Sequence, residues 1–167
     1  MLFMRDSIVL PRIDSPAADM TGPAGDELIE GHGETIILVE DDRQVRAVIA
    51  SMLEALRYNV VQVADGQAVD GALGLHKSSV RLVILDMDLP KASGLACLRR
   101  IRKGRPAIPV IVIGGLLDRH KDEIKDDAVL LPKPFPMSKL ASLVNRSLAD
   151  APSGEQTDDG TDKCTPS

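Results

Sequence analysis

Residues 36–42 read Ile-Ile-Leu-Val-Glu-Asp-Asp, four consecutive apolar residues followed directly by three acids. A short continuous apolar run of this kind is typical of a β-strand that is buried on both faces of a sheet. The same arrangement returns at residues 82–88, which read Leu-Val-Ile-Leu-Asp-Met-Asp. The sequence therefore predicts two buried strands, each ending directly in acidic residues.

Three further strands alternate with helices along the chain. Runs rich in β-branched or aliphatic residues predict strands at 58–63, 110–113 and 128–131. Apolar residues three, four and seven positions apart predict a helix after each strand. The residues that carry this spacing are Val45, Val48, Ile49, Met52, Leu53 and Leu56; Val69, Ala72 and Leu73; Leu95, Leu98 and Ile101; Ile124 in a short helix; and Met137, Leu140, Leu143, Val144 and Leu148.

Buried strands that alternate with helices require a parallel sheet covered on both faces, because parallel strands need crossover connections. The predicted fold is a doubly wound α/β domain with a five-stranded parallel sheet at residues 34–149. Gly, Pro and small residues at 14–33 indicate that residues 1–33 are an N-terminal arm and linker. Residues 150–167 are expected to be a disordered acidic tail.

Composition argues against two kinds of partner. The tail holds five acids and one base, so it accounts for most of the net charge of −5 and leaves the domain close to neutral. Aromatic residues make up 2% of the chain, so base stacking is not expected. No apolar run approaches about 20 residues, and the N-terminus is too charged for a signal peptide. We therefore expect no nucleic acid partner, no membrane partner and a cytoplasmic location.

The chemistry is expected where the strands end, since ligands of doubly wound sheets bind beyond the carboxyl ends of the strands. Glu40 and Asp41 follow the first predicted strand, Asp86 and Asp88 the third, and Lys133 the fifth. Clustered carboxylates repel one another unless a cation or a proton intervenes. Oxygen ligands with room for water suit Mg²⁺, and a lysine can pair with a phosphoryl oxygen. A single acid after a strand could simply cap a helix, as Asp42 is expected to do, but that reading does not explain several acids converging.

These residues also carry a family resemblance. Residues 37–42, residues 85–90 with Gly94, and residues 133–135 together resemble the signature of response-regulator receiver domains of two-component systems. The resemblance covers residues 34–149 and implies the flavodoxin-like strand order 2-1-3-4-5. Pro90 and Gly94 would shape the loop after the phosphoacceptor.

The resemblance implies a role for each site residue. Asp86 would accept a phosphoryl group from a phosphohistidine of a histidine kinase or histidine phosphotransfer protein. Asp41 and Asp86 would bind Mg²⁺ directly, Asp88 through its backbone carbonyl and Glu40 through water. Lys133 would contact the phosphoryl group. The chain would then be a phosphoacceptor signalling domain and not a turnover enzyme.

Two positions depart from the family pattern. Gly114 stands where the family has a Thr or Ser at its switch position, and Leu130 stands where it usually has an aromatic residue. The segment between the fourth and fifth strands is also short for a fourth helix. We expect phosphorylation to change the face formed by the fourth and fifth strands only weakly, unless another residue carries the switch. Leu116 and Asp88 are expected to hinder attacking water and so to slow self-dephosphorylation.

Alternatives concern the class and the output. A haloacid-dehalogenase-like phosphohydrolase could use Asp86-x-Asp88, although its acid pair, Glu40 and Asp41, would then precede the nucleophile in the sequence instead of following it.

The 18 residues after Ala149 are too few for a helix-turn-helix module, so a freestanding regulator with an unidentified downstream protein is expected. Residues 7–12 and 33–36 resemble the junction that precedes the receiver of hybrid histidine kinases.

Overall fold

The computed structural model describes residues 30–90, 94–115 and 117–151 of the chain. Its strands form one sheet in the order β2-β1-β3-β4-β5, and every neighbouring pair is parallel. This confirms the predicted doubly wound α/β fold and its strand order. The strands are β1 (Thr35–Val39), β2 (Asn59–Val63), β3 (Val80–Asp86), β4 (Val110–Gly114) and β5 (Val129–Pro132).

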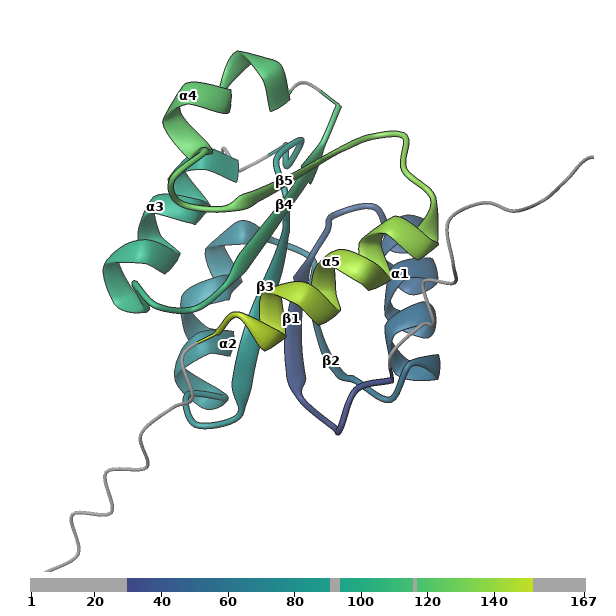
Figure 1. Cartoon of the computed structure of the whole chain (residues 1–167). Coiled ribbons are helices and arrows are strands. Elements are labelled where there is room, and N and C mark those ends of the chain that lie inside the picture. Colours follow the sequence, from purple (N-terminus) through teal and green to yellow (C-terminus); the bar gives the residue numbers. More distant parts are fainter. Residues whose placement is uncertain (1–29, 91–93, 116, 152–167) are drawn as a thin grey trace, which may run out of the picture.

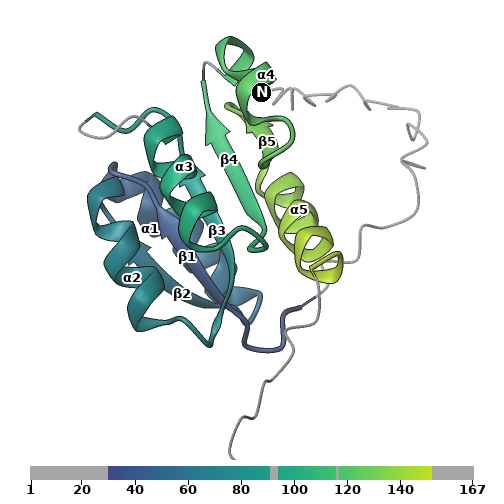
Figure 2. The same ribbon diagram turned by 90° about the vertical axis from the view of Figure 1, so that its left-hand side faces the viewer.

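Helices cover both faces of this sheet. Figure 1 shows α2, α3 and α4 on one side and α1 and α5 on the other, and Figure 2 shows α3 and α5 flanking β4. Two short 3₁₀ turns, η1 (Gly66–Ala68) and η2 (Leu117–Arg119), precede α2 and α4. The helices are α1 (Arg43–Ala55), α2 (Val69–Leu75), α3 (Gly94–Gly104), α4 (Lys121–Ile124) and α5 (Met137–Ala149).

The two faces of the sheet hold two aliphatic cores. Successive side chains of a strand point to opposite faces. Ile36 and Leu38 therefore pack with α1 and α5, whereas Ile37 and Val39 pack with α2, α3 and α4. Cys97 is fully buried in the core that α2, α3 and α4 cover, where its small side chain packs as a hydrophobic residue. Burial on both faces explains why the central strands read as continuous apolar runs.

The structure differs from the sequence pattern at the first helix. Val45 and Val48 are 37% and 56% exposed, although they share its helical spacing. The buried stripe of α1 consists instead of Ile49, Ala50 and Leu53. An α-helix turns by about 100° per residue, so Val48 lies on the flank of the stripe that Ile49 begins.

The segment before residue 34 also contacts the domain. The backbone N–H of Gly31 donates to the carbonyl of Leu56 at 2.8 Å, and the Asn59 side chain donates to the carbonyl of Gly33 at 2.6 Å. A Cβ at Gly31 would lie 2.3 Å from the Tyr58 ring, so this contact requires glycine. Residues 31–33 therefore pack on the domain, although their composition is that of a linker.

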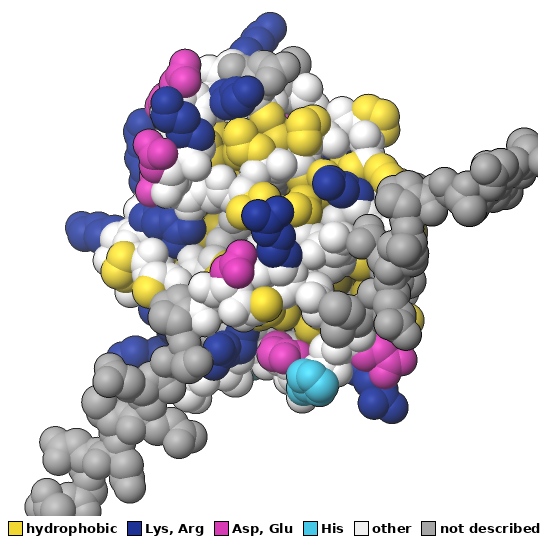
Figure 3. Space-filling model, in the orientation of Figure 1, with side chains coloured by type: hydrophobic (Ala, Val, Ile, Leu, Met, Phe, Trp, Pro, Cys, Tyr) yellow, Lys and Arg dark blue, Asp and Glu magenta, His cyan; other side chains and the backbone are white. Residues whose placement is uncertain are grey.

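Edge strand β5 lies beside the short helix α4. On the face shown in Figure 3, hydrophobic side chains gather along β5 between α4 and α5. Val129 at the start of β5 is 42% exposed. Among the described residues, no helix is both long enough and apolar enough to cross a membrane.

Candidate functional site

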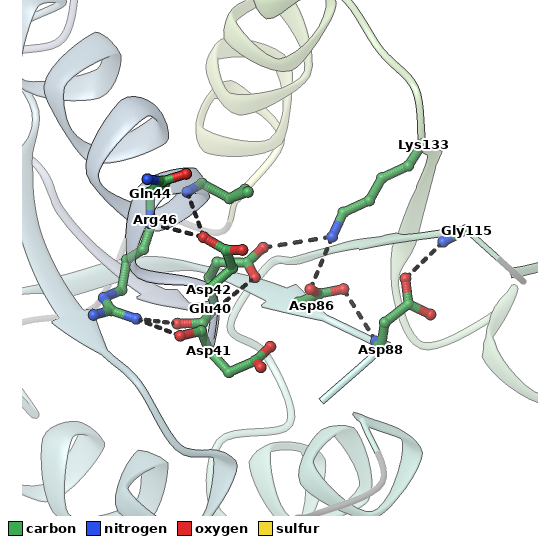
Figure 4. A network of polar contacts seen from close by, with 10 residues as sticks. Glu40, Asp41, Asp42, Gln44, Arg46, Asp86, Asp88, Gly115 and Lys133 are labelled. Carbon is green, nitrogen blue, oxygen red and sulfur yellow. Dashed lines mark hydrogen bonds and ion pairs between the residues drawn. The ribbon is translucent and has the colours of Figure 1, made fainter. Parts of the chain in front are cut away.

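Three carboxylates meet at the carboxyl edge of the sheet. Oxygen atoms of Glu40, Asp41 and Asp86 lie within 4.8 Å of one another. Glu40 and Asp86 are almost completely buried, at 1% and 2% exposure, whereas Asp41 is exposed. Figure 4 shows these side chains gathered between the ends of β1 and β3. The site is therefore half inside the protein and half open to solvent.

Strand register brings two of these acids together. Val39 pairs with Leu85 across β1 and β3, so Glu40 and Asp86 follow at equivalent positions. The backbone N–H of Glu40 donates to the carbonyl of Val63 at 3.1 Å, which extends the β1–β2 pairing past the strand end. The pairing of the strands therefore positions Glu40 and Asp86.

Asp42 caps α1 and does not join the cluster. Its Oδ1 accepts hydrogen bonds from the backbone N–H groups of Gln44 and Val45, at 2.7 and 3.1 Å. These two bonds lower the pKa of the Asp42 carboxyl. The predicted capping role is confirmed, and the cap fixes where the loop carrying Glu40 and Asp41 ends.

Lys133 reaches this cluster from the end of β5. Its Nζ lies 2.8 Å from Oδ2 of Asp86 and 3.5 Å from Oε2 of Glu40. Its backbone N–H donates to the carbonyl of Gly114 at 2.9 Å, which holds β5 to β4 at this level. Burial alone would lower the pKa of Lys133, but the carboxylates of Asp86, Glu40 and Asp88 outweigh it and raise that pKa.

The pKa of Glu40 reflects how closely the carboxylates are packed. Burial, and then the negative charge of Asp86, raise its pKa from 4.5 to about 7. Removing water penalises the charged form of a carboxyl, and a neighbouring anion penalises it again. One ammonium therefore does not fully balance the acids. This set of hard oxygen donors, with one side open to water, fits a Mg²⁺ ion.

Asp88 lies between the ends of β3 and β4. Its backbone N–H donates to Oδ1 of Asp86 at 3.0 Å. Its side-chain Oδ2 accepts a hydrogen bond from the backbone N–H of Gly115 at 2.9 Å (Figure 4). The sequence indicated the position of Asp88 but not this second contact.

Gly114 ends β4 and is packed tightly. A Cβ at this position would lie 3.1 Å from Cδ2 of Leu117 and 3.1 Å from Cβ of Met87. Leu117, 4% exposed, thus lies against the position where a Thr or Ser side chain would begin. Leu130 is half-buried against the core that α2, α3 and α4 cover. Leu116 lies outside the described residues.

Arg46 was not anticipated as part of the site. Its guanidinium donates to the backbone carbonyls of Glu40 and Asp41, at 2.6 and 3.1 Å. This holds the peptide groups of the loop that carries both acids. The available signal was the spacing, since Arg46 stands four residues after the cap Asp42 and hence about one helical turn into α1.

The comparisons agree with this geometry. The family model for the response regulator receiver domain matches residues 36–145. The chain therefore belongs to the receiver family of two-component systems, which displaces the dehalogenase-like alternative. The transcriptional regulatory protein CpxR of Escherichia coli K12 is 32% identical over 123 residues, covering 72% of this chain and 52% of CpxR. The sensor kinase CckA of Brucella abortus is 30% identical over 135 residues, covering 79% of this chain and 13% of CckA.

Solved structures show the same likeness. A response regulator receiver domain from Clostridium thermocellum has a TM-score of 0.65 and 27% identity, covering 70% of this chain and 94% of that one. The receiver domain of a sensor histidine kinase from Pseudomonas aeruginosa, with a magnesium ion coordinated in its active-site cleft, has a TM-score of 0.60 and 30% identity. That match covers 70% of this chain and 98% of the other. The present chain spans about half the length of CpxR and a smaller share of CckA.

Proposed function

We propose that Asp86 accepts a phosphoryl group from a phosphohistidine of a histidine kinase or histidine phosphotransfer protein. The observation that carries this proposal is the ion pair of 2.8 Å between Asp86 and Lys133, beside the almost completely buried carboxyl of Glu40. A carboxylate oxygen of Asp86 would attack phosphorus as the P–N bond of the phosphohistidine breaks. The departing imidazole keeps the bonding electrons and takes up a proton.

The remaining residues assist this transfer. We assign Mg²⁺ to the carboxylates of Asp41 and Asp86 and the backbone carbonyl of Asp88, with Glu40 acting through water. When bound, Mg²⁺ supplies positive charge that offsets the carboxylates and the transferred oxygens. Lys133, already paired with Asp86, would move its hydrogen bond to a phosphoryl oxygen. Arg46 keeps the backbone of Glu40 and Asp41 in place throughout.

We further propose that the domain works as a cytoplasmic signalling switch and not as a turnover enzyme. Its output would pass through protein contact or phosphate shuttling to an unidentified downstream protein, without contact to nucleic acid or membrane. Whether it acts freestanding stays a prediction. Residues 1–29 of the expected arm at 1–33, residues 7–12 of the expected junction, and residues 152–167 of the expected tail lie outside the described residues.

The test uses acetyl phosphate as a small phosphodonor and a phosphate-affinity gel. Wild-type protein is expected to give one shifted band that requires Mg²⁺ and is absent in Asp86→Asn. Asp127→Asn is the matched control, because Asp127 is an exposed aspartate outside the acidic cluster. A shifted band that persists in Asp86→Asn, or after removal of Mg²⁺, would contradict the proposal.

A further inference from the structure

The side chain of Asp88 makes a contact that its proposed backbone role does not use. Its Oδ2 accepts the N–H of Gly115 at 2.9 Å, so the loop after β3 holds the loop after β4 (Figure 4). Both residues are exposed. An exposed hydrogen bond of this kind is stable enough to form and weak enough to be displaced.

Gly115, which Asp88 holds, lies between two residues that are themselves in contact with the domain. On one side, the carbonyl of Gly114 accepts the backbone N–H of Lys133 at 2.9 Å, which ties it to β5. On the other side, Leu117 in η2 is buried in the same core as Ile124 in α4. The bond between Asp88 and Gly115 therefore lies where the chain leaves β4 toward η2 and α4.

Asp88 also contacts Asp86, through its backbone. The backbone N–H of Asp88 donates to Oδ1 of Asp86 at 3.0 Å, so Asp88, two residues after the end of β3, is bonded directly to the phosphoacceptor carboxylate. A phosphoryl group carries a charge of about −1.5 to −2, more than the single charge of the carboxylate it modifies. Lys133 lies within ion-pair distance of Asp86 and Glu40, and no such pair joins it to Asp88 among the described residues. Lys133 therefore attracts the Asp88 carboxylate only from beyond ion-pair distance, and it does not fully offset the added negative charge there.

We propose, resting on the function proposed above, that the Asp88 carboxylate is a phosphorylation-sensitive latch on Gly115. While Asp86 is unmodified, the latch holds the start of the β4–η2 connection. Phosphorylation of Asp86 repels the Asp88 carboxylate from Gly115, and η2 and α4 shift. The Asp88 latch takes the place of the switch hydroxyl that Gly114 lacks. The domain then switches because the negative side chain of Asp88 leaves the Gly115 N–H.

The latch itself is tested first without phosphorylation. Amide resonances and hydrogen exchange are measured on full-length wild type, Asp88→Ala and the charge control Asp150→Ala, in metal-free buffer. Asp88→Ala is expected to speed exchange of the Gly115 amide roughly tenfold or more and to move the amides of 117–124. Asp150→Ala should change neither, because Asp150 lies after α5 and pairs with Arg146. Unchanged 117–124 amides in Asp88→Ala would overturn the latch.

The trigger is tested second, by comparing protein in Mg²⁺ alone with protein in Mg²⁺ plus beryllofluoride, a phosphoryl mimic, so that only the phosphoryl charge differs. In wild type, the Gly115 and 117–124 amides should move toward their positions in Asp88→Ala. Asp88→Asn keeps an acceptor oxygen without the charge, so its 117–124 amides should stay in place. If the amides of 40–42 and 86–88 respond while Gly115 does not, the phosphoacceptor function stands and the latch is wrong. If no amide responds, the proposed function is itself wrong and the latch falls with it.

Discussion

The ammonium of Lys133 lies 2.8 Å from Oδ2 of Asp86, and this ion pair joins the end of β5 to the end of β3. The lysine also lies 3.5 Å from Glu40, so a single cation serves two buried carboxylates. Breaking a buried pair by removing one partner leaves an uncompensated charge in place. The pair therefore matters for the site before any phosphoryl group arrives.

Lys133→Met is expected to slow phosphorylation of Asp86 by roughly a hundredfold, because a preorganised positive group that meets the transferred oxygens is lost. The rate is measured with acetyl phosphate in saturating Mg²⁺. Lys125→Met is the matched control, since Lys125 is exposed and pairs with Asp122 at 3.6 Å. Equal rates in Lys133→Met and wild type would contradict this role.

The raised pKa of Glu40 predicts a pH dependence of the metal-free protein. Its pKa is about 7 in the fold against an ordinary value of 4.5, so the folded state binds more protons between these values. Stability should therefore fall as pH rises from about 4.5 to about 7, by on the order of 2–3 kcal/mol. Urea unfolding with a chelator checks this, and Glu40→Gln should flatten the fall. Added Mg²⁺ should reduce this fall in stability in the wild type. Identical pH slopes in wild type and Glu40→Gln would show that Glu40 does not cause it.

Gly94 allows the backbone at the start of α3 to approach the phosphoacceptor loop. A Cβ there would lie 2.6 Å from Cα of Met87 and 3.0 Å from the carbonyl oxygen of Asp86. Gly94→Ala is expected to lower the free energy of unfolding by roughly 1–3 kcal/mol and to slow phosphorylation. Gly74→Ala in α2 has no heavy atom within 4 Å of the new Cβ and should raise stability instead. Chemical denaturation of both variants measures the difference, and equal effects would exclude this close approach.

Gly114→Ser is expected not to restore an ordinary switch. Its Cβ would press on Leu117 and on Cβ of Met87, each at 3.1 Å, and Met87 cannot move without its backbone. We expect Gly114→Ser to lower the free energy of unfolding by roughly 1 kcal/mol. Leu117→Ala in the same chain should recover part of this loss, a non-additive effect that a double-mutant cycle measures. Strict additivity of the two changes would show that Leu117 does not occupy this space.

The sequence was sufficient for the sheet because the central strands are buried on both faces, which leaves a continuous apolar run in each. It was sufficient for the acidic cluster because the parallel register carries Glu40 and Asp86 to one edge of the sheet. Periodicity was a weaker guide on α1, where a flanking stripe with Val48 has the same spacing as the buried one.

Contacts set by side-chain direction and backbone geometry were not predictable in this way. The donation from Arg46 to the carbonyls of Glu40 and Asp41 depends on where the β1–α1 loop turns. The contact between Asp88 and Gly115 joins residues 27 positions apart through a side chain whose direction no periodic pattern encodes. The packing of Leu117 on Gly114 likewise follows from the path of η2.

Phosphorylation of Asp86 is tested most directly by identifying the residue that carries the acyl phosphate. The full-length protein is phosphorylated by a phosphohistidine donor with Mg²⁺ and then reduced with borohydride, which converts a phosphorylated aspartate to homoserine. Peptide mass spectrometry locates the product. We expect homoserine at Asp86 and no conversion without Mg²⁺. Homoserine at Asp41 or Asp88, or no conversion in the presence of Mg²⁺ and donor, would contradict the account.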